Sequence, residues 1–188
     1  MATATEIQMP TPRPETEPEG RYEVVDGQIQ EKPLMGAFEI WIASALFRAL
    51  VTSPEVQDRG RFVNERLFCL DAEGKLDRRP DLAYVSFERW PRERPIPRVA
   101  AWEVVPDLAI EVISPSNKSV DDAAKLEEYF RAGVRGVWVV YPDVAKVYAY
   151  ESPTTVTILP REGVLEGGDV LPGFRLELAE LLEMPESS

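Results

Sequence analysis

The run Leu108-Ala109-Ile110-Glu111-Val112-Ile113 decides the fold class of this chain, because it is almost continuously apolar and carries one carboxylate in its middle. Such runs are typical of strands that are buried on both faces of a sheet. A carboxylate in such a strand has a large desolvation cost unless it is paired or binds a metal ion. Glu111 is therefore either half of an ion pair in the core or part of a functional site.

Strand and helix patterns alternate on both sides of this run. Asp26-Gly27 favours the tight turn of a β-hairpin over residues 22–31, and apolar residues at helical spacing predict a helix over 38–51. Residues 71–79 form an expected polar turn around Gly74. The other expected elements are strands over 60–70, 82–85, 137–140, 146–150 and 155–159, a helix from Ser119 or Asp121 to Ala132, a break at 114–117 before it, and a short helix over 178–182. This order predicts a mixed α/β sandwich with a central sheet.

Length and composition suit one folded domain. The chain has 188 residues, of which 44% are hydrophobic and 29% are charged. We expect a disordered leader over 1–20, one domain over 21–183 and a tail over 184–188. The absence of a long apolar run and of a secretory-signal pattern predicts no membrane segment and, by default, a cytoplasmic location.

The chain contains no histidine, which excludes many kinds of active site. Ser-His-Asp triads, Cys-His pairs, HExxH zinc sites and His acid–base catalysis are all ruled out. The single cysteine, Cys69, cannot form an intramolecular disulfide and is expected at a buried strand position. Carboxylates without histidine or clustered cysteine favour a hard cation such as Mg²⁺ or Mn²⁺.

Charge is unevenly distributed along the chain. The net charge of −12 disfavours simple electrostatic binding to DNA or to an anionic membrane. Arginines are nevertheless frequent at Arg78, Arg79 and over 89–98. These arginines form either a solvated surface or a basic rim that contacts backbone phosphates.

A second carboxylate, Asp81, follows Pro80 at the start of another apolar strand. Alone it would be a strand-end cap, but together with Glu111 it provides two carboxylates from neighbouring strands, the minimum for a hard-cation site. The remaining alternative is that both acids are merely ion-paired and point to different faces of the sheet.

Three further charged residues are candidates for this site. Lys125 lies four residues before Tyr129, so the two share one helix face. Lys125 either forms a surface pair with Asp121 or points towards the carboxylates. Glu23 and Glu39 are either accessory ligands or solvated side chains.

The order of these motifs resembles a large family of bacterial restriction-endonuclease-like proteins in the PD-(D/E)XK nuclease superfamily. The resemblance covers about residues 22–182 and implies a mixed central sheet flanked by helices. The motifs that carry it are Arg79-Pro80-Asp81, Asp107-Leu-Ala-Ile-Glu111-Val-Ile-Ser-Pro-Ser116, Lys125-Leu-Glu-Glu-Tyr129 and Val137-Trp-Val-Val, together with the hairpin at Tyr22.

The resemblance also implies roles for individual residues. Asp81, Glu111 and the backbone carbonyl of Val112 would bind Mg²⁺ or Mn²⁺. The standard lysine position is occupied by Ile113, so Lys125 would supply the lysine from the following helix. A histidine of the family aligns with Glu39, which leaves open whether Glu39 joins the site.

The function implied is metal-dependent endonucleolytic cleavage of phosphodiester bonds in nucleic acid, with DNA as the expected substrate. A homodimer is compatible with this function, since many nucleases of this fold dimerise to cut two strands. A non-catalytic binding or regulatory module on the same fold is the alternative, because the charge is negative, the lysine is displaced and fold alone does not establish function.

Overall fold

The computed structural model describes residues 20–113 and 119–182. Apart from Gly20, the expected leader over 1–20 lies outside the described residues. The expected break at 114–117 and the tail over 184–188 also lie outside them.

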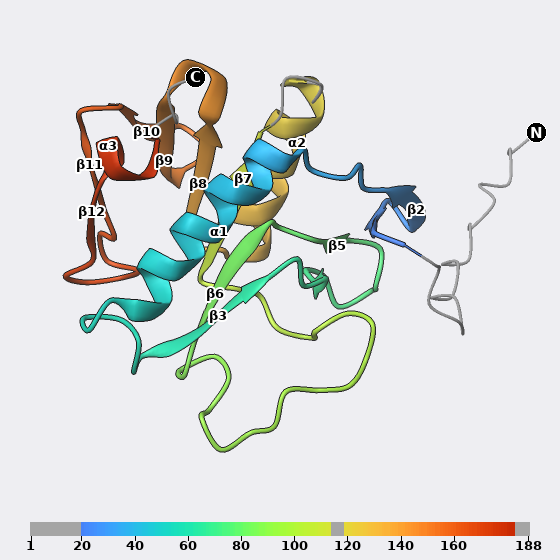
Figure 1. Cartoon of the computed structure of the whole chain (residues 1–188). Helices are drawn as coiled ribbons and strands as arrows, with labels where there is room; N and C mark the ends of the chain where they lie inside the picture. Colours follow the sequence, from blue (N-terminus) through green and yellow to red (C-terminus); the bar gives the residue numbers. More distant parts are fainter. Residues whose placement is uncertain (1–19, 114–118, 183–188) are drawn as a thin grey trace, which may run out of the picture.

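A six-stranded sheet, in the order β10-β9-β8-β7-β6-β3, forms the centre of the fold (Figure 1). Its strands are β3 (Gly60–Asn64), β6 (Leu82–Ser86), β7 (Leu108–Val112), β8 (Gly136–Tyr141), β9 (Lys146–Ser152) and β10 (Thr155–Pro160). Only β7 and β8 are parallel neighbours, and α2 (Ser119–Ala132) makes the crossover that a parallel pair requires. The sheet is therefore mixed, which confirms the predicted fold class.

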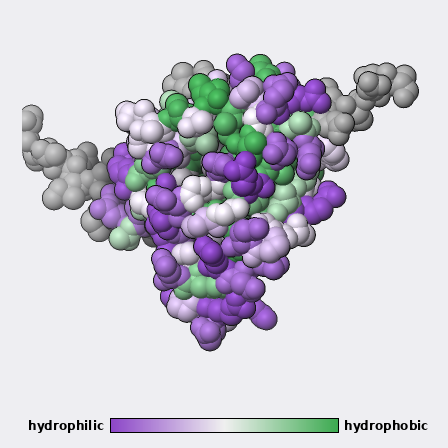
Figure 2. All heavy atoms as spheres, turned by 90° about the vertical axis from the view of Figure 1, so that its left-hand side faces the viewer, coloured by the Kyte–Doolittle hydropathy of each residue, from purple (hydrophilic) through white to green (hydrophobic). Residues whose placement is uncertain are grey.

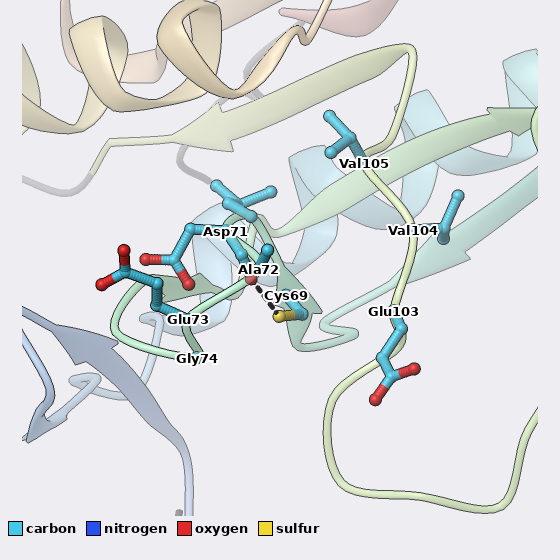
Figure 3. A pocket seen from close by; sticks show the side chains of 9 residues that line it. Cys69, Asp71, Ala72, Glu73, Gly74, Glu103, Val104 and Val105 are labelled. Carbon is cyan, nitrogen blue, oxygen red and sulfur yellow. Dashed lines mark hydrogen bonds between the residues drawn. The ribbon is translucent and has the colours of Figure 1, made fainter. Parts of the chain in front are cut away.

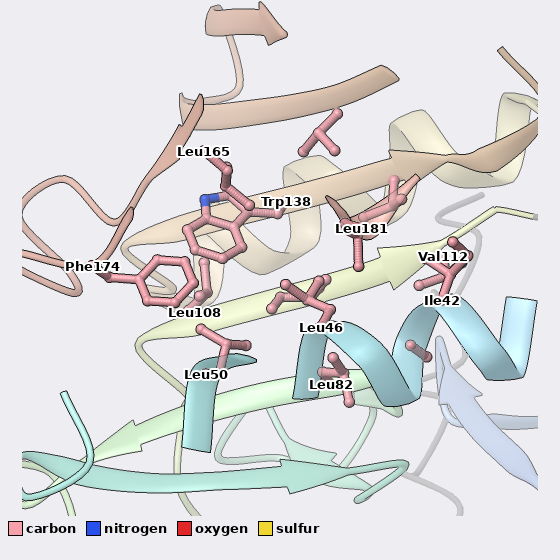
Figure 4. Packing of buried hydrophobic residues seen from close by; sticks show 14 of the residues in the cluster. Ile42, Leu46, Leu50, Leu82, Leu108, Val112, Trp138, Leu165, Phe174 and Leu181 are labelled. Atoms are coloured by element: carbon pink, nitrogen blue, oxygen red, sulfur yellow. The ribbon is translucent and has the colours of Figure 1, made fainter. Parts of the chain in front are cut away.

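The two long helices cover opposite faces of this sheet (Figure 1). On one face, α1 (Ala37–Thr52) contributes Ile42, Leu46 and Leu50, which are fully buried and lie against Leu82 and Leu108 (Figure 4). On the other face, α2 packs through Tyr129 into a second apolar cluster. Both helices agree with the sequence prediction, and α2 ends before Gly133, whose φ of 97° suits a helix terminus.

A smaller antiparallel sheet, in the order β2-β1-β5-β4, lies beside the central one. It begins with the predicted hairpin of β1 (Tyr22–Val25) and β2 (Gln28–Glu31). At its turn Asp26 and Gly27 have φ angles of 51° and 76°, as a tight primed turn requires. The sheet is completed by β4 (Phe68–Cys69) and β5 (Asp77–Arg78).

The prediction of one strand over 60–70 is wrong. The chain leaves β3 after Asn64 because Glu65 adopts a φ of 49° and donates its N–H to the carbonyl of Asp81 at 2.9 Å. After this turn, β4 joins the smaller sheet by pairing with β5. The expected polar turn over 71–79 therefore contains a short buried strand.

The final segment contains a hairpin that the sequence patterns did not indicate. It consists of β11 (Val164–Glu166) and β12 (Arg175–Glu177) and leads into the predicted short helix α3 (Leu178–Leu181). Figure 2 views the molecule from this side. Polar side chains cover most of the face, and apolar side chains gather in its upper part. None of the helices in the described part of the chain has the length and apolar content that crossing a bilayer requires.

Candidate functional site

Sheet register brings Asp81 and Glu111 together. Strands β6 and β7 are antiparallel and pair Leu82 with Ile110, so the next position along places Asp81 opposite Glu111. Opposite residues in a ladder project to the same face, which here is the face covered by α2. Both acids are buried, with 3% and 7% of their surface exposed. The alternative in which the two carboxylates point to different faces is thus wrong.

Backbone and side-chain donors hold Asp81 in one orientation. Its Oδ2 accepts a hydrogen bond from the backbone N–H of Val112 at 2.8 Å. Its Oδ1 accepts one from Lys32 Nζ at 2.7 Å, and a guanidinium nitrogen of Arg21 lies 3.9 Å away. One oxygen is thus fixed by the sheet, while the other faces a cation.

The two oxygens of Glu111 have different partners. Its Oε1 lies 2.8 Å from Lys125 Nζ and accepts a hydrogen bond from the Tyr129 hydroxyl at 2.7 Å. Its Oε2 lies 3.5 Å from Lys32 Nζ. Lys125 and Tyr129 thus reach the same carboxylate from α2, as their spacing of four residues predicts. Lys125 points towards the acids and is not confined to a surface pair.

Glu23 also joins this group. Its Oε1 lies 2.9 Å from Lys125 Nζ, and its Oε2 lies 2.8 Å from an Arg78 nitrogen. Arg78 continues the chain of charges to Glu128 at 2.5 Å. The alternative of a solvated Glu23 is therefore wrong, because its carboxylate is buried between two cations.

These contacts fix the protonation states around the site. Burial disfavours the ammonium of Lys125, but Glu111 and Glu23 outweigh burial and raise its pKa. Burial and the neighbouring charge of Glu111 also raise the pKa of Tyr129 well above its ordinary value. Lys125 is therefore charged and Tyr129 is a protonated hydrogen-bond donor at neutral pH.

Acid unfolding offers a test of the buried position of Glu23. Burial alone would raise its pKa, but Lys125 and Arg78 outweigh burial and lower the pKa from its ordinary 4.5 to about 2. A depressed folded-state pKa means that the carboxylate stabilises the fold above pH 4.5 and that this stabilisation is lost as the pH falls towards 2. We expect Glu23 to contribute a slope of up to about 1.4 kcal/mol per pH unit to the unfolding free energy in that window.

Urea unfolding at several pH values measures this slope. The Glu23→Gln protein should lose less stability than the unaltered protein as the pH falls, because its side chain cannot take up the proton. Equal slopes for the two proteins would show that the charge on Glu23 does not support the fold.

Lys32 is a contact residue of both acids that sequence reasoning missed. Its Nζ donates to Asp81 Oδ1 and to the carbonyl of Arg79 at 2.6 Å, and it lies near Glu111 Oε2. The residue directly follows β2, all of whose residues are exposed. Nothing in the local sequence pattern distinguishes it from a surface lysine.

Glu39 lies apart from these contacts. It is buried in the first turn of α1, the helix on the sheet face opposite Glu111. Within the described residues, the ion pairs of Asp81 and Glu111 involve only Arg21, Lys32 and Lys125. The alternative of a solvated Glu39 is therefore wrong as well, but Glu39 does not share the lysine that links Glu23 and Glu111.

Two of the arginines considered for phosphate binding are already paired with acids of the protein. Arg89 lies 3.0 Å from Asp107, and Arg92 lies 3.0 Å from Asp58. The loop over 89–98 follows the end of β6 and precedes β7, whereas the two site acids lie at the other ends of these strands (Figure 1). A basic rim formed by this loop would therefore be remote from the acids.

The donor set at Asp81 and Glu111 fits a hard cation. One oxygen of each carboxylate already faces the same ammonium nitrogen, and oxygen ligands suit Mg²⁺ and Mn²⁺. Among the residues that the structure describes, no three Asp, Glu, Cys or His side chains gather in a metal-binding arrangement. The further ligand expected from the chain is the backbone carbonyl of Val112, whose N–H already donates to Asp81 Oδ2.

A pocket of about 560 Å³ lies elsewhere, lined by residues 69–74 and 103–105 (Figure 3). Cys69 lies in β4, as its predicted strand position requires, but its side chain is only half-buried. Its thiol donates to the carbonyl of Asp71 at 2.9 Å, shown as the dashed line in Figure 3. None of the predicted site residues lines this pocket, so we do not assign the chemistry of the acids to it.

The chain is similar to proteins described as putative nucleases. A protein-family model with the description "Uma2: Putative restriction endonuclease" matches residues 7–179. A crystal structure described as a putative nuclease belonging to DUF820 from Anabaena variabilis ATCC 29413 has a similar fold, with a TM-score of 0.74 and 20% sequence identity. That match covers 89% of this chain and 92% of the other. Comparison with curated proteins gives no match.

Proposed function

Because the chain belongs to the Uma2 family of restriction-endonuclease-like proteins, we propose that it is a metal-dependent endonuclease that hydrolyses phosphodiester bonds in DNA. Family and fold support the nuclease class, in agreement with the PD-(D/E)XK superfamily. The observation that carries the proposal is the position of Asp81 and Glu111, whose carboxylates lie 2.7 and 3.5 Å from one shared ammonium nitrogen.

In this proposal, Asp81 Oδ1, Glu111 Oε2 and the carbonyl of Val112 would hold Mg²⁺ or Mn²⁺. When bound, such a cation lowers the pKa of a coordinated water and neutralises charge that builds up on a phosphate. The hydrogen bond from the Val112 N–H holds Asp81 Oδ2, so that Oδ1 is directed towards Lys32. The acids are therefore oriented before substrate arrives.

Lys125 and Tyr129 would act on the other side of Glu111. Both contact Oε1, so they fix the plane of this carboxylate and leave Oε2 towards Asp81. The ammonium of Lys125 would also orient the attacking water or stabilise negative charge on the phosphate. Charges that are positioned beforehand in a buried site need little reorganisation during the reaction.

The net charge of −12 is compatible with a DNA substrate if attraction is local. The proposed cation and the ammonium groups of Lys32 and Lys125 would concentrate positive charge at the acids. A homodimer would contain two such sites, one for each strand of a DNA duplex. Acting on cellular DNA, the enzyme would work in the cytoplasm.

Removal of the metal ion tests this function. The protein, incubated with supercoiled plasmid and Mg²⁺ or Mn²⁺, is expected to produce nicked circles. Excess chelator should reduce nicking to background, and renewed addition of the metal ion should restore it. Gel electrophoresis of the plasmid forms measures the rate.

Two outcomes would contradict the proposal. Nicking that persists in chelator would mean that no exchangeable metal ion is needed. DNA binding without any nicking in either metal ion would favour the non-catalytic binding module on the same fold.

A further inference from the structure

Lys32 makes three contacts through one nitrogen. Its Nζ lies 2.7 Å from Asp81 Oδ1, 2.6 Å from the carbonyl oxygen of Arg79 and 3.5 Å from Glu111 Oε2. The ammonium therefore donates two hydrogen bonds, to Asp81 and to Arg79, and forms an ion pair with Glu111. Only 12% of the side chain is exposed.

The two lysines of the site occupy different sides of Glu111. Lys125 lies on Oε1, where it also contacts Glu23, whereas Lys32 lies on Oε2 and bridges to Asp81. A divalent cation bound by Asp81 Oδ1 and Glu111 Oε2 would leave Lys125 in place. Because the Lys32 ammonium already contacts both of these oxygens, a cation held by the same two oxygens would be repelled strongly by it.

We propose that Lys32 is an internal competitor of the divalent cation and thereby sets the metal affinity of the site. This inference rests on the proposed function, which supplies the metal ion. Without the cation, the ammonium offsets the repulsion between Asp81 and Glu111. When the cation binds, it displaces the ammonium from between the two acids.

The location of Lys32 allows this exchange. It follows β2, an edge strand of the smaller sheet whose residues are all exposed, and it begins the irregular segment 32–36. The backbone is held by the bond from the Lys32 N–H to the carbonyl of Arg21 at 2.9 Å. The flexible four-carbon side chain can therefore swing away while the main chain stays in place.

Titration of Mn²⁺ into the protein without nucleic acid tests this competition. We expect Lys32→Gln to bind Mn²⁺ about tenfold more tightly than the unaltered protein, or tighter still, because no fixed cation must be displaced. Lys32→Arg keeps a positive charge and should bind Mn²⁺ no more tightly than the unaltered protein does. Lys75→Met is the matched control, since it removes one positive charge from a half-exposed lysine that pairs with Glu73. Its affinity should be unchanged.

Thermal unfolding followed by circular dichroism gives a second readout. Without metal ion, the Lys32→Gln protein should melt at a lower temperature than the unaltered protein. The repulsion between Asp81 and Glu111 is no longer offset in this variant. Saturating Mn²⁺ should raise its melting temperature by more than it raises that of the unaltered protein. Lys32→Met provides the same comparison if the glutamine protein does not fold.

The Mn²⁺ titrations distinguish a failure of the role of Lys32 from a failure of the metal site itself. If the unaltered protein binds Mn²⁺ and both neutral variants bind it equally or more weakly while folded, Lys32 is not a competitor and the metal site stands. If none of the proteins binds Mn²⁺, the metal site itself is contradicted, and the inference is contradicted with it.

Discussion

Plasmid nicking by the Glu111→Gln protein is expected to be about a thousandfold slower than nicking by the unaltered protein. The amide keeps the shape of the side chain but removes the charge that the proposed cation requires. It also weakens the contacts of Oε1 with Lys125 and Tyr129, which orient the carboxylate. Nicking rates at saturating Mg²⁺, measured on supercoiled plasmid, give the comparison.

Glu166→Gln is the matched control for this change. Glu166 is an exposed acid paired with Arg175 on the β11–β12 hairpin, so its loss should leave nicking unchanged. Circular dichroism should show that both variants are folded. Nicking by the Glu111→Gln protein within tenfold of the unaltered rate would show that Glu111 is not a metal ligand in the reaction.

The Arg78→Met protein is expected to lose about 3–5 kcal/mol of unfolding free energy. The guanidinium of Arg78 is buried, with 8% of the side chain exposed, and it contacts Glu23 at 2.8 Å and Glu128 at 2.5 Å. Methionine fills much of the space but leaves both carboxylates without this partner. Uncompensated buried charges are costly because water cannot solvate them. Urea unfolding measures the loss.

The Arg92→Met change is the control for Arg78→Met, because Arg92 belongs to an exposed ion pair. Arg92 and Asp58 lie 3.0 Å apart, but 57% and 78% of their side chains are exposed. The Arg92→Met change should therefore alter stability by less than about 1 kcal/mol. A similarly small loss for Arg78→Met would mean that the buried chain of charges contributes little to the fold.

Local sequence patterns pointed to the two acids that the structure brings together. The apolar run around Glu111 indicated a buried strand, and Pro80 marked the entry to the strand that follows Asp81. The sequence analysis expected the two acids on neighbouring strands, and the register of β6 and β7 agrees with this expectation. The helix spacing placed Lys125 and Tyr129 on one face, and the resemblance singled out Lys125 as the displaced lysine; both side chains contact Glu111.

Other parts of the site depend on contacts between distant segments. Lys32 reaches Asp81 across 49 positions in the sequence, and Arg78 reaches Glu23 across 55. No spacing rule relates such residues, because only the folding of the hairpin onto the central sheet brings them together. The division of segment 60–70 was also hidden, since it depends on the bond between Glu65 and the Asp81 carbonyl.

Anomalous diffraction from a crystal soaked in Mn²⁺ would show directly whether Asp81 and Glu111 form one divalent-metal centre. We expect a single strong peak about 2.0–2.6 Å from Asp81 Oδ1 and from Glu111 Oε2, with the ammonium of Lys32 displaced from between them. A crystal without a peak between these carboxylates, with Lys32 still bridging them at saturating Mn²⁺, would contradict this metal centre.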